Sequence, residues 1–315
     1  MPRAVWGPPT APVLFNLIDD STSSVPISDD VDALVLSLYS FDPTTGVTTL
    51  IDQDAMLEDS DPISGRVLVR SESGASKLRV LDLSNQSQVG ELPVDPLAAG
   101  CLMPDGEVLA FSDGSVLQWN PDNGISGEIA KASDLGLTTD VDKAVCRGPE
   151  VAALDHNGVL VVLDTDTLAS SVLSKTADPN ADPAMAWVGT SLYWVQSDYP
   201  AHTFGLAGYD ISSGTGSTED FSGLGFGFMA SGIAPWGSAK VLVVRGMLGT
   251  GFSLSELVTD KPGDRSTSDQ APLNIKHAAN VAILHAYPSA DSKEILVIVD
   301  EPSASASDLY LVVVQ

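Results

Sequence analysis

Two cysteines, Cys101 and Cys146, carry the most reactive side chains in this sequence. Each lies a few residues before a Glu-Val pair that opens an apolar run, so the two occupy matching places in successive sequence units. A disulfide requires Cα atoms within about 7 Å of each other. The pattern leaves two interpretations open: a Cys101–Cys146 disulfide, or two buried thiols.

Metal ligation is the second chemistry that the residue types allow. Asp164 and Asp166, each followed by a threonine, place carboxylate and hydroxyl oxygens in one short stretch. Calcium takes about six to eight oxygen ligands from a compact loop. The stretch has no Asp-x-Asp-x-Asp-Gly run, so a solvated turn is the first interpretation and a calcium site the second. No two histidines have zinc-ligand spacing, and no other cofactor is predicted.

Aromatic side chains gather between residues 187 and 199. Trp194, Tyr199 and His202 lie in or near a loop that would line one face of the molecule, and they are candidates for binding a sugar or a peptide. Packing between neighbouring sheets is the alternative, because large rings fill such interfaces. The sequence has no Gly-x-Ser-x-Gly nucleophile elbow and no histidine close to either cysteine, so we predict no catalytic residue.

The charge balance limits the classes of partner. Acidic residues outnumber basic ones by 42 to 15, which gives a formal net charge of -27. Nucleic acids and anionic membrane surfaces are bound by clustered Lys and Arg, so this composition argues against both. No apolar run approaches the roughly 20 residues that span a bilayer, and no membrane insertion is predicted. The simplest role of the acidic surface is solubility.

The N-terminal stretch lacks the apolar core and the small-residue cleavage site of a signal peptide. The low number of lysines and the wealth of Ser, Thr, Asp and Gly in β-rich units are typical of exported bacterial domains. We therefore expect a periplasmic or extracellular protein from which a leader has been removed, with the cytoplasm as the alternative.

A repeated pattern predicts the elements that position these residues. An apolar run ends in Asp or Asn and is followed by a short polar turn that often contains Gly. Successive copies are 38 to 50 residues apart, a period that indicates the blades of a β-propeller. The marking residues are Asp42, Asp82, Asn120, Asp164, Asp210 and Asp260.

The clearest unit runs over residues 97–130 and reads as four short strands separated by turns at Asp-Gly and Asn-Gly pairs. Counting such units predicts one all-β domain, residues 1–315, folded as a seven-bladed propeller of four-stranded antiparallel blades; six or eight blades are the alternatives. The final apolar run, residues 309–315, lacks a following strand. An N-terminal strand is therefore expected to pair beside it and close the propeller.

The stretch GCLMPDGEVLAF, residues 100–111, resembles the repeat of the periplasmic Tol-system propellers and of the prolyl oligopeptidase propeller. In those families an innermost strand ends in Pro-Asp-Gly and the next strand begins at once. The Trp-Asp and Gly-His signatures of WD-repeat proteins are absent, so the resemblance identifies the β-propeller superfamily and no subfamily.

The functional expectation is a non-catalytic propeller that binds a protein or peptide, or acts as a scaffold. Two alternatives remain: a metal-assisted, calcium-dependent hydrolase or lactonase of propeller fold, and a structural domain of a larger cell-surface protein.

Overall fold

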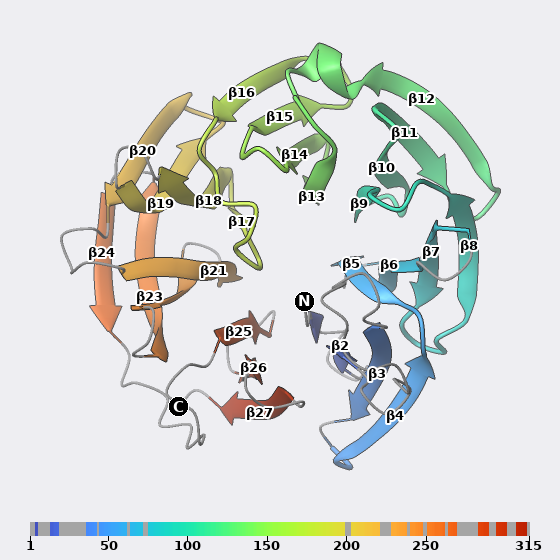
Figure 1. Cartoon of the computed structure of the whole chain (residues 1–315), viewed down its shortest axis with the longest axis horizontal. Coiled ribbons are helices and arrows are strands. Elements are labelled where there is room, and N and C mark those ends of the chain that lie inside the picture. Colours follow the sequence, from blue (N-terminus) through green and yellow to red (C-terminus); the bar gives the residue numbers. More distant parts are fainter. Residues whose placement is uncertain are drawn as a thin grey trace, which may run out of the picture. The chain divides into compact units, whose positions relative to one another are not determined.

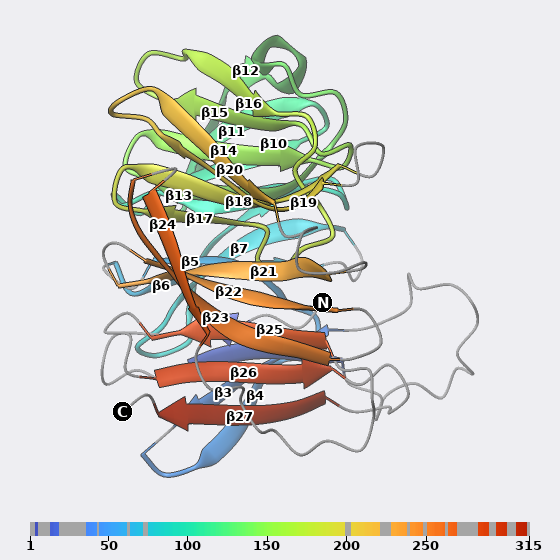
Figure 2. The same ribbon diagram turned by 90° about the vertical axis from the view of Figure 1, so that its left-hand side faces the viewer.

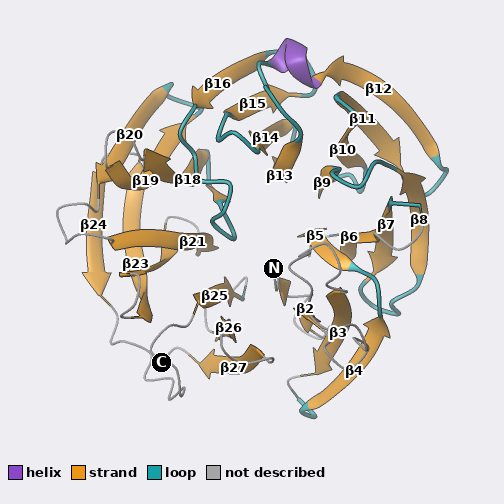
Figure 3. Cartoon of the chain, in the orientation of Figure 1, coloured by secondary structure: helices purple, strands orange, loops and turns teal. Residues whose placement is uncertain are grey.

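A computed structural model describes most of the chain. The described residues are 4–5, 13–18, 36–42, 44–61, 64–71, 75–198, 203–220, 228–237, 240–247, 251–261, 264–269, 283–289, 294–300 and 307–313. Within them the structure is built from strands, with one short 3-10 helix, η3 (Ala132–Leu135) (Figure 3). The chain divides into two compact units, residues 1–151 with 163–170, and residues 152–162 with 171–315.

Three complete sheets belong to the first unit, and each is made from consecutive strands (Figure 1). The first contains β1 (Ala4–Val5), β2 (Val13–Ile18), β3 (Leu36–Asp42) and β4 (Val47–Asp52). The second contains β5 (Met56–Asp61), β6 (Arg66–Ser71), β7 (Lys77–Asp82) and β8 (Gln88–Pro93). The third contains β9 (Ala99–Leu102), β10 (Val108–Ser112), β11 (Ser115–Asn120) and β12 (Ile125–Lys131).

The fourth sheet contains β13 (Val141–Arg147), β14 (Glu150–Asp155), β15 (Leu160–Asp164) and β16 (Ser170–Ser174). Three further sheets belong to the second unit. The fifth contains β17 (Met185–Val188), β18 (Ser191–Asp198), β19 (Thr203–Asp210) and β20 (Thr215–Asp220). The sixth contains β21 (Phe228–Trp236), β22 (Lys240–Met247), β23 (Gly251–Lys261) and β24 (Asp264–Asp269). The seventh contains β25 (Ile283–Pro288), β26 (Glu294–Asp300) and β27 (Ser307–Val313).

The predicted unit at residues 97–130 is the third sheet, with strand order β12-β11-β10-β9. Its core-facing side chains pack against those of the second sheet. Leu102, Val108, Ala110 and Trp119 form one buried cluster with Leu68, Leu78, Val80 and Leu92. Burying a side chain such as Leu or Val contributes about 1.5–3 kcal/mol. In an isolated sheet these apolar side chains would be exposed to solvent, so the second and third sheets stabilise each other.

One turn follows the third strand in each of the first five sheets, and it explains the repeated Asp or Asn. A side-chain oxygen of that residue accepts a hydrogen bond from the backbone N–H two positions later, which fixes the start of the turn. The donor–acceptor pairs are Thr44–Asp42 at 2.8 Å, Ser84–Asp82 at 2.7 Å, Asp122–Asn120 at 3.0 Å, Asp166–Asp164 at 3.0 Å and Ser212–Asp210 at 2.9 Å.

The same turn requires a left-handed backbone conformation at the residue four positions after the Asp or Asn. There the N–H donates to the carbonyl of the Asp or Asn, at 2.7–2.9 Å in all five turns. The positive φ angles are 71° at Gly46, 61° at Gln86, 73° at Gly124, 57° at Leu168 and 67° at Gly214. Glycine adopts this conformation without steric cost, whereas Gln86 and Leu168 do not.

The structure corrects the expected pairing of the chain ends. β2 pairs with both β1 and β3, so the N-terminal strands complete the first sheet. β27 pairs with β26, and the seventh sheet has three strands among the described residues. β2 has both of its edges occupied within its own sheet, and β1 pairs with β2, so neither strand belongs to the sheet of β27.

The fourth strand of the sixth sheet is also present, although the sequence Asp264–Asp269 has no apolar residue. β24 pairs with β23 over six positions, with one irregularity. Ladder hydrogen bonds come from the backbone, so an outer strand forms even when its side chains are polar.

Leu168→Gly should stabilise the protein, because it removes the cost of a left-handed leucine whose side chain is 47% exposed. We expect a gain of about 0.5–1 kcal/mol in the free energy of unfolding, measured by urea denaturation. The released left-handed strain, about 1–2 kcal/mol, exceeds the cost of the larger conformational entropy of glycine in the unfolded chain.

Gly124→Ala is the matched control for Leu168→Gly. It places a Cβ in open space but at a positive φ, and it should cost about 1 kcal/mol. Equal stability of both variants and the wild type would contradict this account of the turn.

Candidate functional site

The first strands of the second, third and fourth sheets lie side by side in the first unit. β9 is the middle strand, with β5 on one side and β13 on the other. No backbone ladder joins β9 to either neighbour. Side-chain groups on β5 and β13 make the connections instead, and these groups form the candidate site.

A disulfide joins β9 to β13. The Cys101 and Cys146 sulfur atoms are 1.99 Å apart, and the Cα atoms are separated by 5.6 Å. Cys101 is fully buried. The structure therefore adopts the first of the two interpretations of these cysteines, because their matching places on neighbouring first strands bring the Cα atoms within bonding range.

A partly buried carboxylate joins β9 to β5. Asp59 Oδ2 accepts a hydrogen bond of 2.8 Å from the Leu102 N–H, and Oδ1 accepts one of 2.8 Å from the Ser60 N–H. Burial raises the pKa of Asp59 to about 7, while the two backbone donors act in the opposite direction. The charges of Asp61 and Glu58 raise the pKa further.

A β-bulge on β5 sets the direction of the neighbouring carboxylate. Leu57 pairs with Val69 and Asp59 with Leu68, so Glu58 is the additional residue. Its side chain is 3% exposed and forms an ion pair of 3.0 Å with Arg70. A bulge can turn one side chain away from the regular alternation of a strand, which here directs Glu58 to a cation.

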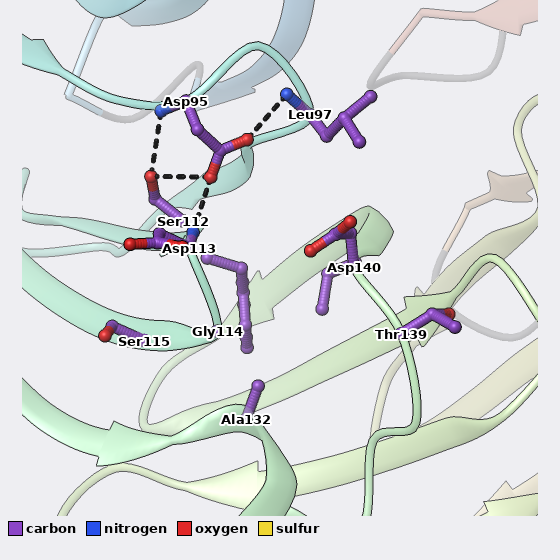
Figure 4. A pocket seen from close by; sticks show the side chains of 11 residues that line it. Asp95, Leu97, Ser112, Asp113, Gly114, Ser115, Ala132, Thr139 and Asp140 are labelled. Carbon is purple, nitrogen blue, oxygen red and sulfur yellow. Dashed lines mark hydrogen bonds between the residues drawn. The ribbon is translucent and has the colours of Figure 1, made fainter.

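Arg70 extends these connections to the segment that leads into β9. Its Nη1 donates to the carbonyls of Pro96 and Ala98, both at 3.0 Å. Asp95, in the same segment, accepts hydrogen bonds from the Leu97 N–H at 2.7 Å and from the Ser112 hydroxyl at 3.1 Å (Figure 4). The Asp59, Glu58–Arg70 and disulfide contacts therefore all hold β9 or the segment that leads into it.

A small depression lies next to Asp95. It is lined by residues of the third sheet and by Thr139 and Asp140 (Figure 4). Its enclosed space is on the order of one water molecule, too small for an organic ligand. Because the Asp95 oxygens already accept hydrogen bonds, we interpret the depression as part of the hairpin packing.

The calcium candidates occupy the β15–β16 turn. Asp164 Oδ1 accepts hydrogen bonds from the Asp166 and Thr167 N–H groups, both at 3.0 Å. Asp164 therefore serves the turn in the same way as Asp42, Asp82 and Asp210. The part of the chain that the structure describes has no group of three or more His, Cys, Asp or Glu side chains placed to hold a metal ion. A calcium site at Asp164 and Asp166 stays a prediction.

Of the predicted binding residues, the structure describes Trp194. It lies on β18 and is 5% exposed, and its indole N–H has no hydrogen-bond partner among the described residues. Such burial favours packing over a surface platform. Tyr199 and His202 lie outside the described residues. His156 is exposed in the β14–β15 turn.

The residues that converge on β9 include several that the sequence reasoning missed: Glu58, Asp59, Arg70 and Asp95. Three acidic residues, Glu58, Asp59 and Asp61, lie on the short strand β5. Because β5 has neighbouring strands on both sides, such carboxylates must be paired with a cation or protonated, and this pattern is the signal in the sequence. Chemically, Asp59 titrates near neutrality, but both of its oxygens accept backbone hydrogen bonds. The group is built to hold β9 and is not positioned to transfer protons to a substrate.

No known family model matches this chain, and no curated protein matches it. Solved structures do. The structure of U3-55K has a TM-score of 0.68 at 11% identity and covers 99% of this chain and 98% of its own. A chain of the mitotic checkpoint complex has a TM-score of 0.61 at 14% identity, with 96% and 84% covered. The fold is a β-propeller.

An oligogalacturonate lyase in complex with manganese has a TM-score of 0.59 at 12% identity, with 100% and 96% of the two chains covered. At these identities the matches show the fold alone. The predicted all-β, seven-bladed propeller fold is confirmed, and the resemblance to Tol-type repeats extends no further than this fold. The described part of the propeller contains no helix with the length and apolar character that a membrane crossing requires.

Asp59→Asn should flatten the pH dependence of stability between pH 5 and pH 8. In the wild type the folded pKa, about 7, lies above the model value of 3.8. The contribution of Asp59 to the free energy of unfolding is therefore fully present below pH 4. It decreases as the pH rises from 4 to 7, by about 1.4 kcal/mol per pKa unit and a few kcal/mol in total. The asparagine stays neutral throughout, so unfolding by guanidinium at each pH should show a smaller change.

Asp82→Asn is the control for the Asp59 variant. The Ser84 hydroxyl and N–H lower the pKa of Asp82, so its titration acts only at low pH, and Asn120 shows that an amide can hold this turn. Between pH 5 and pH 8 the control should follow the wild type. If Asp59→Asn also follows the wild type there, Asp59 is not the titrating group.

Replacing both cysteines with alanine should destabilise the propeller. The bond links residues separated by 45 positions, and a loop of that length predicts a loss of about 2–4 kcal/mol in the free energy of unfolding. Denaturation midpoints of the oxidised wild type, the reduced wild type and the double variant provide the measurement. Reduced wild type and double variant should agree, and an unchanged midpoint in both would refute a stabilising bond.

Proposed function

We propose that this propeller is a non-catalytic binding module for a positively charged protein or peptide. The observation that carries the proposal is its charge: a net -27, with six of the described basic side chains already matched to carboxylates. The acidic surplus is therefore left for an external partner. Complementary potentials raise the rate of association and select among partners.

Six ion pairs support this account in the first unit. They use arginines and lysines on strands or beside them, with N–O distances of 2.6–3.0 Å. The exposed pairs Lys77–Glu91 and Lys131–Glu128 contribute little to stability, about 0–1 kcal/mol each, whereas the Arg70–Glu58 pair is largely buried. Their effect on the surface is to neutralise basic groups locally. The pairs are Arg66–Asp122, Arg70–Glu58, Lys77–Glu91, Arg79–Asp52, Lys131–Glu128 and Arg147–Glu150.

The fold does not decide between binding and catalysis. One matched chain is part of the mitotic checkpoint complex, and another is an oligogalacturonate lyase with manganese. No observation in the described residues favours the metal-assisted hydrolase or lactonase. The electrostatic argument therefore selects the binding function, with a cationic polypeptide as its partner.

We further propose that the propeller works in an oxidising compartment, the periplasm or the extracellular space. The Cys101–Cys146 disulfide supports this location, because such bonds persist mainly outside the reducing cytosol.

The binding proposal is tested with two pools of extended Ser/Thr-rich peptides, one carrying Lys and Arg, the other with Glu and Asp at the same positions. Calorimetry should show saturable one-to-one binding of the cationic pool, weakening several-fold between about 50 and 200 mM salt as charges are screened. Equal binding of both pools, or no saturable binding of the cationic one, would refute the function.

A further inference from the structure

One turn of the second sheet carries a sequence pattern that the proposed binding function does not use. Asn85, Gln86 and Ser87 form the pattern Asn-x-Ser, in which x is any residue except proline. This pattern is the acceptor signal for N-linked glycosylation. Among all the asparagines of the sequence, Asn85 is the one that has Ser or Thr two positions later.

The fold places this tripeptide at the surface. The turn joins β7 to β8, and β8 stands at one end of the strand order β5-β6-β7-β8 (Figure 2). Asn85 and Ser87 are both exposed, so an enzyme can reach their side chains. Two backbone hydrogen bonds fix the turn: the Gln86 N–H donates to the Asp82 carbonyl at 2.7 Å, and the Asp82 N–H donates to the Ser87 carbonyl at 2.9 Å.

The Asn85 carboxamide is held in one orientation. Its Oδ1 accepts a hydrogen bond of 2.8 Å from the Ser87 N–H. This contact is an Asx turn, in which a side-chain oxygen binds the backbone two residues later. The bond anchors one branch of the carboxamide, and Nδ2, the atom that receives a sugar, is on the other branch. A hydrogen bond at the oxygen also polarises the amide and makes its N–H more acidic.

A second turn in the same unit provides an internal comparison. Asn123 occupies the same position in the β11–β12 turn as Asn85 does in the β7–β8 turn, three residues after the marking Asp or Asn. Its Oδ1 accepts a hydrogen bond of 2.9 Å from the Ile125 N–H, so both asparagines form the same local contact. The third residue of the pattern differs: it is Ser87 in one turn and Ile125 in the other. The hydroxyl group therefore distinguishes Asn85 from Asn123.

We propose that Asn85 is the acceptor of an N-linked oligosaccharide. The donor is an oligosaccharide carried on a polyprenyl diphosphate, and a transferase supplies the base. Asn85 Nδ2 forms a bond to the anomeric carbon of the first sugar, and one Nδ2 proton passes to the base. The bond from that carbon to the diphosphate oxygen breaks, and the diphosphate leaves with the bonding electrons. The inference goes beyond the proposed binding function and uses the proposed location, because this modification occurs on surface loops of secreted proteins.

Transfer to the folded protein tests the acceptor directly. The purified propeller is incubated with an oligosaccharyltransferase and its lipid-linked donor, and a short Asn-x-Thr peptide verifies that the enzyme is active. The wild type should gain the mass of one oligosaccharide per chain. Asn85→Gln and Ser87→Ala should each reduce transfer at least tenfold, whereas Ser87→Thr should keep it. Urea denaturation of each variant verifies that it is folded.

Ile125→Thr is the matched variant that gains an acceptor. Ile125 is 69% exposed, and the change completes the Asn-x-Thr pattern at Asn123 in a turn with the same local contact. We expect this variant to accept a second oligosaccharide, at Asn123. A wild type that accepts none would overturn the proposal, whether or not Asn123 becomes modified in the variant.

The protein isolated from its own cells supplies the second test. Its intact mass should exceed that of the sequence by one oligosaccharide, and peptide mapping should place the sugar on Asn85. A native protein that contains the Cys101–Cys146 bond and an unmodified Asn85 would overturn this proposal and leave the oxidising location standing. Binding of cationic peptides is measured separately, so a failure of the binding function leaves the glycosylation result unchanged.

Discussion

A small antiparallel sheet cannot cover its own faces, and this constraint governs the structure. The cluster of Leu68, Leu78 and Val80 with Val108 and Trp119 shows the solution: apolar side chains of one sheet are buried by those of the next. Strands of each sheet also differ in their needs. Middle strands are apolar and paired on both edges, while outer strands such as β4 and β12 remain exposed and polar. The sheets therefore depend on their neighbours for stability.

Neighbouring sheets also need connections that backbone ladders do not provide, and polar groups supply them. Asn16, which is buried on β2, donates to the Ala55 carbonyl and accepts from the Leu57 N–H. Asp59 on β5 accepts a hydrogen bond from the Leu102 N–H of β9, and the disulfide joins β9 to β13. Each link satisfies polar groups that would be costly to bury alone. The candidate site is thus a set of hydrogen bonds, an ion pair and a disulfide that connect neighbouring sheets.

Much of this fold could be predicted because its signals are local. The turns at Asp42, Asp82, Asn120, Asp164 and Asp210 depend on hydrogen bonds within a few residues, so their spacing appears directly in the sequence. The expected pairing of the chain ends was wrong, because it depends on backbone partners that side-chain patterns do not report. Asp59 and Glu58 were missed for a related reason: their burial is created by strands distant in sequence.

The repeated turn also has a consequence for the acidity of the molecule. Asp42, Asp82 and Asp210 have lowered pKa values because hydroxyl and backbone donors bind their carboxylates, and for Asp210 the pKa is about 2. Asn120 fills the same position without a charge. Some of the negative charge is thus a by-product of hairpin architecture, and the isoelectric point can drift through Asp-to-Asn exchanges at these corners while the loops keep their shape.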